Sequence, residues 1–405
     1  MRKQFVFGVV AAIAVAILPT VSAQTASADT NWATCGDITA CGGMDALVAE
    51  AQKEGSLNLT TILRNWADYG DALDSFKAAF GINIADDNPN GSSAYEINLI
   101  KTAPAATQPD VVDIGASHIV DTADSTGVSI FAPYKVQTWN DIPATWKDST
   151  GLWFGNYSGQ IVIGYNAKDK VAPKSFKDLL NPAFKHSVGI AGDPTGAQES
   201  LMTVLAASVA NGGSLDNVTP GVNYFHKLKL AGNLSSAPAT AASVVSGQTK
   251  AWTDWSFNAP GVAAQAAKAG TTLKYVFPSD AAVTGTPYIF GINKNAPHPA
   301  SARLWVEFMM SEKKGLLAKD LDGQDPYNLQ QGTEKGSTLF NSLMGGQNIF
   351  RLGGAAPILG SVMASHKLLV PAPNVILGTS GATAVPTIAQ QLAAVAVLKT
   401  AWPKI

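Results

Sequence analysis

The stretch SLNLTTILRNWADYGDALDSFKAAFGINI, residues 56–84, alternates between two kinds of pattern and decides the fold class. Hydrophobic and polar residues alternate over 56–63, which is the period of a half-buried strand. Over 69–80 the hydrophobic residues recur at helical spacing, and Gly81 follows as a typical helix end. Residues 82–84 predict a second strand, so the whole stretch predicts a strand–helix–strand unit.

The same alternation continues on both sides of this stretch. Residues 45–54 form an amphipathic pattern that stops at Gly55, and residues 111–114 predict a buried strand. Ser93 with Glu96 three residues later predicts a capping box that opens a helix through Thr102. Helices that alternate with strands predict a parallel sheet covered by helices, and hence an α/β fold. A second block of this kind follows, with strands predicted at 161–165, 188–191, 250–254, 273–277 and 288–292 and helices at 176–180, 197–209, 219–232, 299–310 and 387–401.

The first residues have the composition of an export signal. The basic start Met1-Arg2-Lys3 leads into an apolar run over 5–18, and small residues follow at 21–23 and 26–28. This pattern predicts a signal peptide over residues 1–28, with cleavage after residue 23 or after residue 28. The apolar run is too short to span a bilayer comfortably. We therefore expect a periplasmic or secreted protein.

Composition and charge exclude some partners. The formal net charge is −2 and no stripe of Lys and Arg is present, so nucleic acid is not an expected partner. The only cysteines are Cys35 and Cys41. In an oxidising compartment they are expected to form a small-loop disulfide that pins the N-terminal region, with free or modified thiols as the alternative.

The order of several segments resembles one protein family. The chain is similar to the bacterial extracellular solute-binding proteins of ABC importers, in the branch with polyamine-, ferric-iron-, thiamine- and aminophosphonate-binding members. The resemblance covers about residues 44–325, and residues 345–382 depart from the family pattern. No single motif is specific; the ordered set carries the resemblance, and it comprises 47–63, Pro109-Asp110-Val111-Val112-Asp113-Ile114-Gly115, 159–166, Pro173-Lys174-Ser175-Phe176-Lys177-Asp178-Leu179-Leu180, Gly192-Asp193-Pro194-Thr195-Gly196 and 288–293.

The resemblance implies a two-lobe fold of the periplasmic-binding-protein type, type II, in which the lobes close on a ligand. Two crossings between lobes are expected, near residues 157–165 and 287–293. Lobe I would then hold 44–156 with 294–330, lobe II would hold 166–286, and 331–405, with additional C-terminal helices, would pack on lobe II. The implied partners are a small-molecule solute and a membrane permease, and the protein is expected to be a monomer without a cofactor.

Ligands of open α/β sheets bind at the carboxyl ends of strands, and five segments of the sequence fit that place. The first three follow predicted strands or open a helix in the first block. Each has a plainer interpretation: Trp66 as a packed lid, Ser93 as a helix cap, and His118 as a solvated loop histidine. The binding candidates in these segments are Arg64, Trp66, Tyr69, Ser92, Ser93 and Ser117.

The other two segments lie in the second block. Asp193, Thr195 and Gly196 precede a long helix whose free N–H groups favour an anionic group, although a structural cap is equally expected there. Trp252, Asp254 and Trp255 place a carboxylate between two aromatic rings, a pattern that suits an ammonium group. The alternative is that one tryptophan faces the core. Tyr157 and Tyr288, at the expected crossings, complete the candidate site.

The sharpest hypothesis for the solute is an amine-bearing molecule, polyamine-like or aminophosphonate-like. Iron is the alternative within the family, because Tyr69, Tyr157 and Tyr288 can supply phenolates, although the adjacent tyrosines of iron-binding relatives are missing here. The five histidines are scattered and form no zinc pattern, and no nucleophile elbow or Walker motif is present. A secreted hydrolase with a triad dispersed in sequence stays a third possibility, but binding without catalysis or a bound metal is the prediction.

Overall fold

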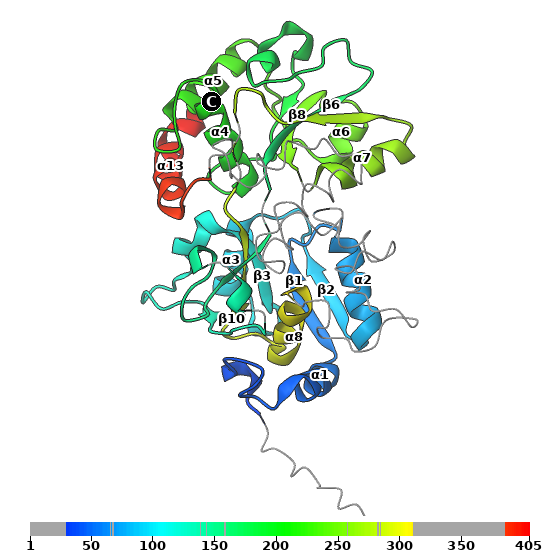
Figure 1. Ribbon diagram of the computed structural model, residues 1–405, viewed down its shortest axis with the longest axis vertical. Helices are drawn as coiled ribbons and strands as arrows, with labels where there is room; N and C mark the ends of the chain where they lie inside the picture. The colour runs from blue at the N-terminus through cyan, green and yellow to red at the C-terminus, as the bar shows by residue number, and fades with distance from the viewer. Residues whose placement is uncertain are drawn as a thin grey trace, which may run out of the picture.

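The computed structural model describes residues 30–310 and 385–405, apart from residues 65, 67, 68, 138, 143, 158, 257, 282 and 284. The elements form two lobes that lie one above the other along the long axis (Figure 1). The predicted signal peptide and the atypical segment 345–382 lie outside the described residues. None of the described helices is long and apolar enough to cross a membrane.

The first lobe is built on two sheets. Strands β1 (Ser56–Thr60) and β2 (Asn83–Asp87) pair in parallel, with Ser56 opposite Asn83. Strand β10 (Tyr288–Asn293) lies in the middle of the other sheet and pairs antiparallel with its neighbours β3 (Val111–Gly115), β4 (Phe131–Ala132) and β5 (Phe154–Tyr157). The helices of this lobe are α1 (Gly43–Glu54), α2 (Tyr69–Phe80), α3 (Ser93–Thr102) and α8 (Pro299–Met310).

The second lobe has a four-stranded sheet of order β7-β8-β6-β9. Its strands are β6 (Ile161–Asn166), β7 (Val188–Gly189), β8 (Ala251–Trp255) and β9 (Leu273–Val276). Strand β6 runs antiparallel to β8 and β9, whereas β7 and β8 are parallel. The helices of this lobe are α4 (Gln198–Ala210), α5 (Thr219–Leu230), α6 (Ala241–Val245) and α7 (Ala259–Lys268).

The β1-β2 pair is parallel, as predicted, but all pairs of the β10 sheet are antiparallel and the sheet of the second lobe is mixed, which corrects the prediction of a parallel sheet for these two. The α/β alternation was predicted from the sequence, but strand direction was not, because β10 returns from the second lobe and enters the first sheet from the opposite end. The chain passes from β5 to β6 on the way out and from β9 to β10 on the way back. These are the two crossings expected of the two-lobe fold. The exact residue boundaries predicted for the lobes, including the placement of 331–405, stay a prediction.

The C-terminal helix and a set of short 3₁₀ helices complete the described elements. The last helix, α13 (Ile388–Ala401), begins at Thr387, whose side chain and that of Gln390 form a reciprocal capping box. The 3₁₀ helices are η1 (Trp32–Thr34), η2 (Ala105–Thr107), η3 (Ala116–Thr122), η4 (Trp139–Asp141), η5 (Ala144–Trp146), η6 (Lys177–Leu180), η7 (Pro182–Phe184) and η9 (Trp402–Lys404).

The capping box predicted at the start of α3 is wrong. Ser92, not Ser93, is the N-cap residue, and its hydroxyl accepts a bond from the Tyr95 N–H. Ser93 and Glu96 turn inward instead, where they accept bonds from backbone N–H groups of β3. The tertiary contact with a buried strand therefore overrides the local cap, and it brings Glu96 into the interior.

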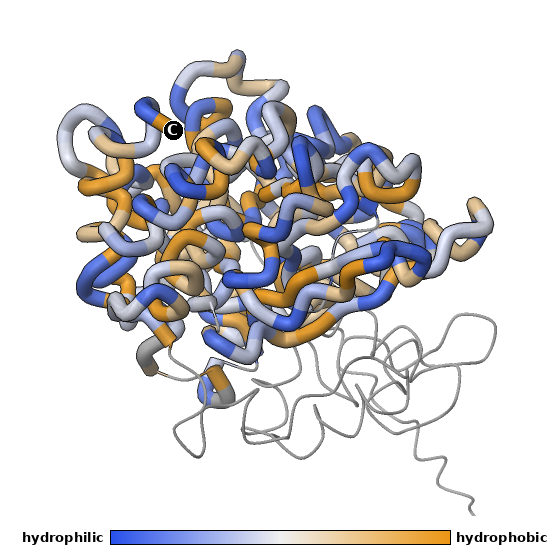
Figure 2. Tube along the Cα trace, turned by 90° about the horizontal axis from the view of Figure 1, so that it is seen from above, coloured by the Kyte–Doolittle hydropathy of each residue, from blue (hydrophilic) through white to orange (hydrophobic). Residues whose placement is uncertain are grey.

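The core is one large hydrophobic cluster that includes residues of both lobes, with a smaller cluster in each lobe. Its largest fully buried side chains include Trp255 and Trp305. Seen from above, hydrophobic and hydrophilic residues alternate along the chain, as expected of elements that are buried on one face (Figure 2).

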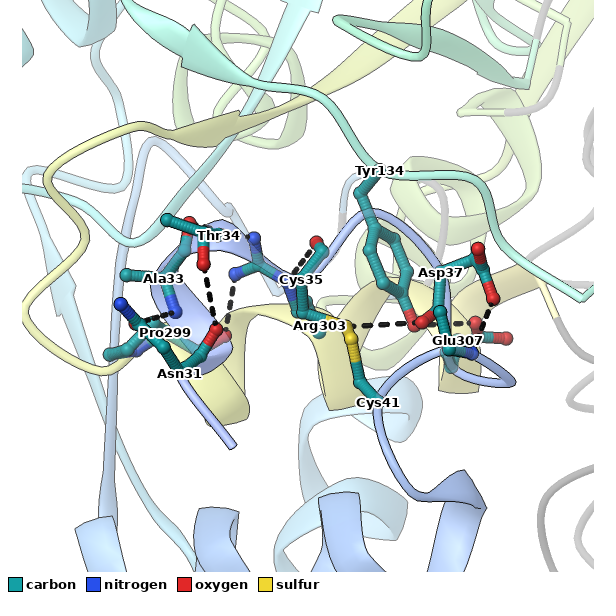
Figure 3. Close-up of a disulfide and its surroundings, with 11 residues drawn as sticks. Asn31, Ala33, Thr34, Cys35, Asp37, Cys41, Tyr134, Pro299, Arg303 and Glu307 are labelled. Atoms are coloured by element: carbon teal, nitrogen blue, oxygen red, sulfur yellow. Dashed lines mark hydrogen bonds between the residues drawn. A yellow bond between two sulfur atoms is a disulfide. The ribbon is translucent and has the colours of Figure 1, made fainter. Parts of the chain in front are cut away.

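The N-terminal segment is fixed to α8. Cys35 and Cys41 form the predicted disulfide (Figure 3). The buried Arg303 guanidinium donates to the backbone carbonyls of Ala33 and Cys35, at 3.1 and 3.0 Å. Burial raises the pKa of the nearby Glu307 carboxyl to about 7, although it accepts a bond from the Tyr134 hydroxyl. A buried cation with carbonyl partners thus ties the start of the chain to a helix far along the sequence.

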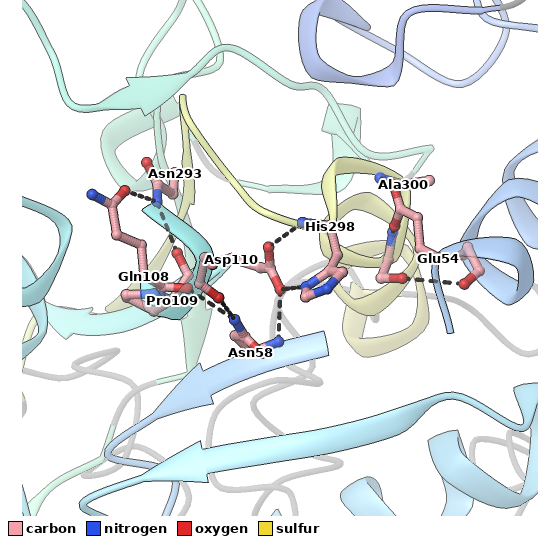
Figure 4. Close-up of polar contacts among 11 residues, drawn as sticks. Glu54, Asn58, Gln108, Pro109, Asp110, Asn293, His298 and Ala300 are labelled. Carbon is pink, nitrogen blue, oxygen red and sulfur yellow. Dashed lines mark hydrogen bonds and ion pairs between the residues drawn. The ribbon is translucent and has the colours of Figure 1, made fainter. Parts of the chain in front are cut away.

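A second buried polar group joins β1, β3 and α8. Asp110, at the start of β3, accepts bonds from the N–H of Asn58 at 2.6 Å and from the N–H of His298 at 2.6 Å (Figure 4). Glu54 accepts bonds from the N–H groups of Ala300 and Ser301 in the first turn of α8. These carboxylates satisfy donors that a helix start leaves unpaired, so they are structural.

Candidate ligand-binding site between the lobes

Asp113 is a carboxylate in a strand whose residues are all buried. Its Oδ2 atom accepts bonds from the hydroxyls of Tyr69 at 2.5 Å and Tyr157 at 3.0 Å. Asn156 Nδ2 in turn donates to the Tyr69 hydroxyl at 2.9 Å. The other oxygen, Oδ1, has no hydrogen-bond partner among the described residues, and neither has Asn156 Oδ1. Burial raises the pKa of Asp113 to about 7 in spite of the three donors nearby.

Glu96 places a second acid beside Asp113. Its Oε2 atom accepts a bond from the Asp113 N–H at 3.0 Å, and the side chain is fully buried. Burial raises the pKa of Glu96 well above its usual range, and the charge of Asp113 raises it further. The first lobe therefore holds two buried acids close together.

Aromatic side chains from both lobes meet next to these acids. The Tyr157 and Tyr288 rings stack with centroids 4.9 Å apart. Trp66 Nε1 donates to the Tyr157 hydroxyl at 2.7 Å, and Trp255 Nε1 donates to the Tyr288 hydroxyl at 3.2 Å. Trp66 belongs to the loop between β1 and α2, Trp255 to β8, and the two tyrosines to the crossing strands. The cluster thus lies where the two lobes and both crossings meet.

The second lobe contributes its own pair of buried acids, Glu199 and Asp254. Asp254 Oδ1 accepts bonds from the Trp255 N–H at 2.8 Å and from Asn258 Nδ2 at 2.9 Å. Burial raises the pKa of Asp254 to about 6. Glu199, in the first turn of α4, is only 5% exposed. Its pKa is raised well above the usual range by burial and then by the charge of Asp254.

Glu199 and Asp254 receive few hydrogen bonds from the described residues. No hydrogen bond joins the Glu199 carboxylate to any group in the part of the chain that the structure describes. The Tyr275 hydroxyl is also buried without a hydrogen-bond partner among the described residues. Burial raises the pKa of Tyr275, and the charges of Asp254 and Glu199 add to the shift. Buried polar atoms without partners are rare in protein interiors, and a bound water, ion or ligand is one way in which they are satisfied.

Acids of both lobes raise the pKa of the same tyrosine. Burial raises the pKa of Tyr288, followed by the charge of Glu199 from the second lobe and by those of Asp113 and Glu96 from the first. Within residues 30–310 and 385–405, as far as they are described, no ion pair joins any of the four acids to Lys, Arg or His. The same residues contain no group of three or more His, Cys, Asp and Glu that could hold a metal ion.

Comparison with known proteins identifies the family. The family model for the bacterial extracellular solute-binding proteins matches residues 109–337. The chain belongs to this family. The family supplies the solute-binding components of ABC importers, which implies a small-molecule ligand, a membrane permease as partner and a periplasmic location. No curated protein sequence matches the chain.

Solved structures support the fold of this solute-binding protein. A protein named for spermidine/putrescine ABC transport, from Listeria monocytogenes, is 14% identical, with a TM-score of 0.52, and the match covers 85% of this chain and 99% of the other. The periplasmic binding protein P5PA is 18% identical, with a TM-score of 0.50 and coverage of 72% and 99%. At these identities the likeness concerns the fold alone.

Several of the predicted site residues of this solute-binding protein lie together. The aromatic cluster around Asp113 contains Trp66, Tyr69, Tyr157, Trp255 and Tyr288. Trp252 and Asp254 lie on the opposite face of β8 from Trp255, because successive strand positions face opposite sides of the sheet, and a hydrogen bond from the Trp252 side chain helps to lower the pKa of Asp254. The Trp252 ring packs edge-on against Tyr275 at 5.6 Å, in the smaller core cluster of the second lobe. Their roles in binding stay predictions.

The remaining candidates take other positions. Arg64 forms an ion pair with Asp74 at 2.6 Å, and both side chains are exposed. The Thr195 N–H and hydroxyl donate to Asp193, in a loop that Gly196 follows. Ser117 donates to Gln198 at 2.6 Å, across the boundary between the lobes. Ser92 caps α3, and Ser93 accepts a hydrogen bond from the Gly115 N–H of β3.

Sequence reasoning missed the acids Glu96, Asp113 and Glu199 and the amide Asn156. Asp113 had a signal, because a charged residue inside an otherwise apolar, fully buried strand is unusual unless it is paired. Glu96 was hidden by its match to a capping box. Glu199 had no distinguishing signal, since an acid in the first turn of a helix is ordinary.

Proposed function

We propose that this protein captures a small amine-bearing solute between its two lobes and delivers it to the membrane permease of an ABC importer. Family membership carries the general part of this proposal. The four buried acids that lack a cationic partner among the described residues, Glu96, Asp113, Glu199 and Asp254, carry the chemistry of the solute.

Burial of several acids without a positive charge is unfavourable, because desolvation and mutual repulsion both oppose ionisation. The raised pKa values of all four groups express this cost. A bound ammonium group removes the imbalance, since it supplies the missing charge and donates hydrogen bonds to Asp113 Oδ1 and to Glu199. The acids are thus matched to a cationic solute and poorly matched to an anionic one.

The aromatic cluster supports the same ligand. Aromatic faces attract cations by about 0.5–2 kcal/mol, more when water is excluded. The rings of Trp66, Tyr157, Tyr288 and Trp255 contact one another, Tyr157 donates to Asp113 of the first lobe, and Tyr288 feels the charge of Glu199 of the second. A solute with an apolar stem and ammonium ends would fit this order of groups.

The two pairs of acids lie in different lobes, and we therefore favour a solute with two ammonium groups over one with a single charge. A dication would contact both lobes and so favour the arrangement in which they lie together. An aminophosphonate is the weaker candidate, because its anionic end would face carboxylates here, and the loop predicted to receive it has Asp193 bonded to Thr195.

Ferric iron is the second candidate, since Tyr69, Tyr157 and Asp113 converge with Tyr288 beside them. Ionised phenolates would be needed, and burial raises the pKa of all three tyrosines well above the usual range. A trivalent cation would have to overcome that shift. The amine is therefore the primary proposal.

Isothermal titration of ligand-stripped protein tests the proposal. The panel contains diaminobutane, spermidine, aminobutane, an aminoethylphosphonate and a ferric salt. We expect the diamine and spermidine to bind and aminobutane to bind at least about tenfold more weakly, because it leaves one pair of acids unmatched. Binding of ferric salt with no heat from any amine or aminophosphonate would refute the amine proposal.

Two variants test whether the second lobe binds the second ammonium group of the solute. Asp254→Asn should bring the affinity for diaminobutane close to that for aminobutane. Glu50→Gln is the matched control, because Glu50 pairs with Lys53 on the surface and its loss changes only the net charge. A preference for diaminobutane that survives in Asp254→Asn would remove Asp254 from the site.

A further inference from the structure

The C-terminal helix α13 contacts both lobes. Ile388, in its first turn, packs against the small core cluster of the first lobe, which contains Ile114 and Ile289. At its other end, Trp402 lies edge-on to Phe225 of α5 in the second lobe, with ring centroids 5.3 Å apart. The helix also lies against η3, and Figure 1 shows it beside α4 and α5 of the second lobe. It therefore spans the boundary between the lobes.

Gln391 is the central residue of this contact and is 0% exposed. Its Nε2 atom donates to the Thr286 hydroxyl at 2.7 Å. Its Oε1 atom accepts a bond from Gln198 Nε2 at 2.8 Å. Thr286 lies just before β10, in the return crossing, and Gln198 is the first residue of α4. A single side chain of α13 thus bonds to a crossing segment and to the second lobe.

Gln198 extends this network to the first lobe. Its Oε1 atom accepts a bond from the Ser117 hydroxyl of η3 at 2.6 Å, and its Nε2 atom also donates to Thr286 at 3.1 Å. A Cβ atom at Gly115 would lie only 2.5 Å from the Gln198 Cβ, so the end of β3 and the start of α4 approach as closely as glycine permits. Ser117, Gln198, Thr286 and Gln391 form a closed, buried network, which we call the hinge network.

Surface charges also link α13 to the first lobe. Asp121 in η3 forms a hydrogen bond with His118, and this bond is the main reason why the pKa of Asp121 is lowered. The positive charges of Lys399 on α13 and of Lys101 on α3 lower it further. The exposed side of α13 is thus also attracted to the first lobe.

We propose that α13 is a strap across the hinge, and that Gln391 stabilises the lobe arrangement seen here against a more open one. Any opening that separates Ser117 from Gln198, or shifts Thr286 along α13, leaves buried amide and hydroxyl groups without partners. Such groups are costly until water reaches them. The strap therefore sets how often the lobes part before a solute arrives, whatever that solute is.

A distance measurement between the lobes tests the strap in the absence of solute. Spin labels are placed at Val128→Cys in the first lobe and Leu230→Cys in the second, where the native side chains are 56% and 74% exposed. Pulsed electron spin resonance then gives the distribution of distances. We expect Gln391→Met, which keeps the length of the side chain but removes its bonds, to raise the population of longer distances about fivefold.

Gln390→Met is the matched control, because Gln390 bonds to Asp216 of the second lobe and caps its own helix without contacting the hinge network. It should leave the distribution unchanged. An unchanged distribution in Gln391→Met, or an equal shift in Gln390→Met, would overturn the strap. Should Gln391→Met fail to fold, Ser117→Ala removes the bond that joins the hinge network to the first lobe. The same shift is expected there, and a wild-type distribution in that variant also rejects the strap. Because no solute is added, the result is independent of the proposed amine.

Discussion

The acids of the two lobes differ in how the protein supports them. In the first lobe, Asp113 receives two phenol hydroxyls, and Asn156 holds one of these hydroxyls in place. In the second lobe, Asp254 has two nitrogen donors, while Glu199 has no hydrogen bond among the described residues. The half of the proposed site around Asp113 is thus organised by hydrogen bonds before a solute binds, whereas in the other half Glu199 is buried without a hydrogen-bond donor or a cation among the described residues.

This difference bears on how binding and lobe movement are linked. A ligand shifts a conformational equilibrium only by the difference in its affinity for the two states. If a solute binds first to the organised half around Asp113, its contact with Glu199 and Asp254 is the one that favours the closed state. The following predictions test this asymmetry, in order of expected effect.

Loss of the organised acid should have the largest effect. We expect Asp113→Asn to weaken binding of the preferred amine by about 100-fold, because removal of one partner of a buried charge pair costs about 3 kcal/mol or more. Isothermal titration measures this, with Glu50→Gln as the control for net charge. An affinity within threefold of wild type would place the cation away from Asp113.

The pH dependence of stability should reveal the unpaired acids. The pKa of Asp113 is raised from 3.8 to about 7, and that of Asp254 from 3.8 to about 6. Between pH 3.8 and these raised values, the folded protein therefore binds more protons than the unfolded chain. The free energy of unfolding without solute should therefore fall as the pH rises from about 4 to 7, by about 2 kcal/mol or more. Chemical denaturation at several pH values measures this decline, and Asp254→Asn should make it shallower. Stability that rises through this range would contradict the assignment.

Removal of the unsupported acid should stabilise the empty protein. Glu199→Gln replaces a buried carboxylate that repels Asp254, and we expect a gain of about 1 kcal/mol in the free energy of unfolding at pH 8. The same change should weaken amine binding about tenfold. Loss of stability together with unchanged binding would show that Glu199 is structural.

Arg64 gives the smallest expected effect. Its exposed ion pair with Asp74 contributes about 0–1 kcal/mol, as surface pairs do. We expect Arg64→Ala to change amine affinity less than twofold, as judged by the same titrations. A large loss would return Arg64 to the site and favour a solute with an anionic end.

The sequence was sufficient for the fold class and for part of the site. Helical and strand periods are local, so the α/β alternation could be predicted from the residues, whereas the two lobes and their crossings followed from the resemblance to the family. Tyr69, Tyr157 and Tyr288 could be selected because they lie at strand ends and at those crossings. The direction of β10 and the inward turn of Glu96 could not, because each depends on contacts between segments far apart in the chain. The role of Asp113 could not be predicted for the same reason, since its phenol donors come from α2 and β5.

The position of β10 has a consequence for the order of folding. This strand lies at the centre of the first sheet, yet it follows the whole second lobe in sequence. The four strands of the second sheet, by contrast, come from one continuous segment between residues 161 and 276. As the chain emerges, the second lobe can therefore complete its sheet first, while the N-terminal strands wait for residues 288–293 and expose unpaired edges until then.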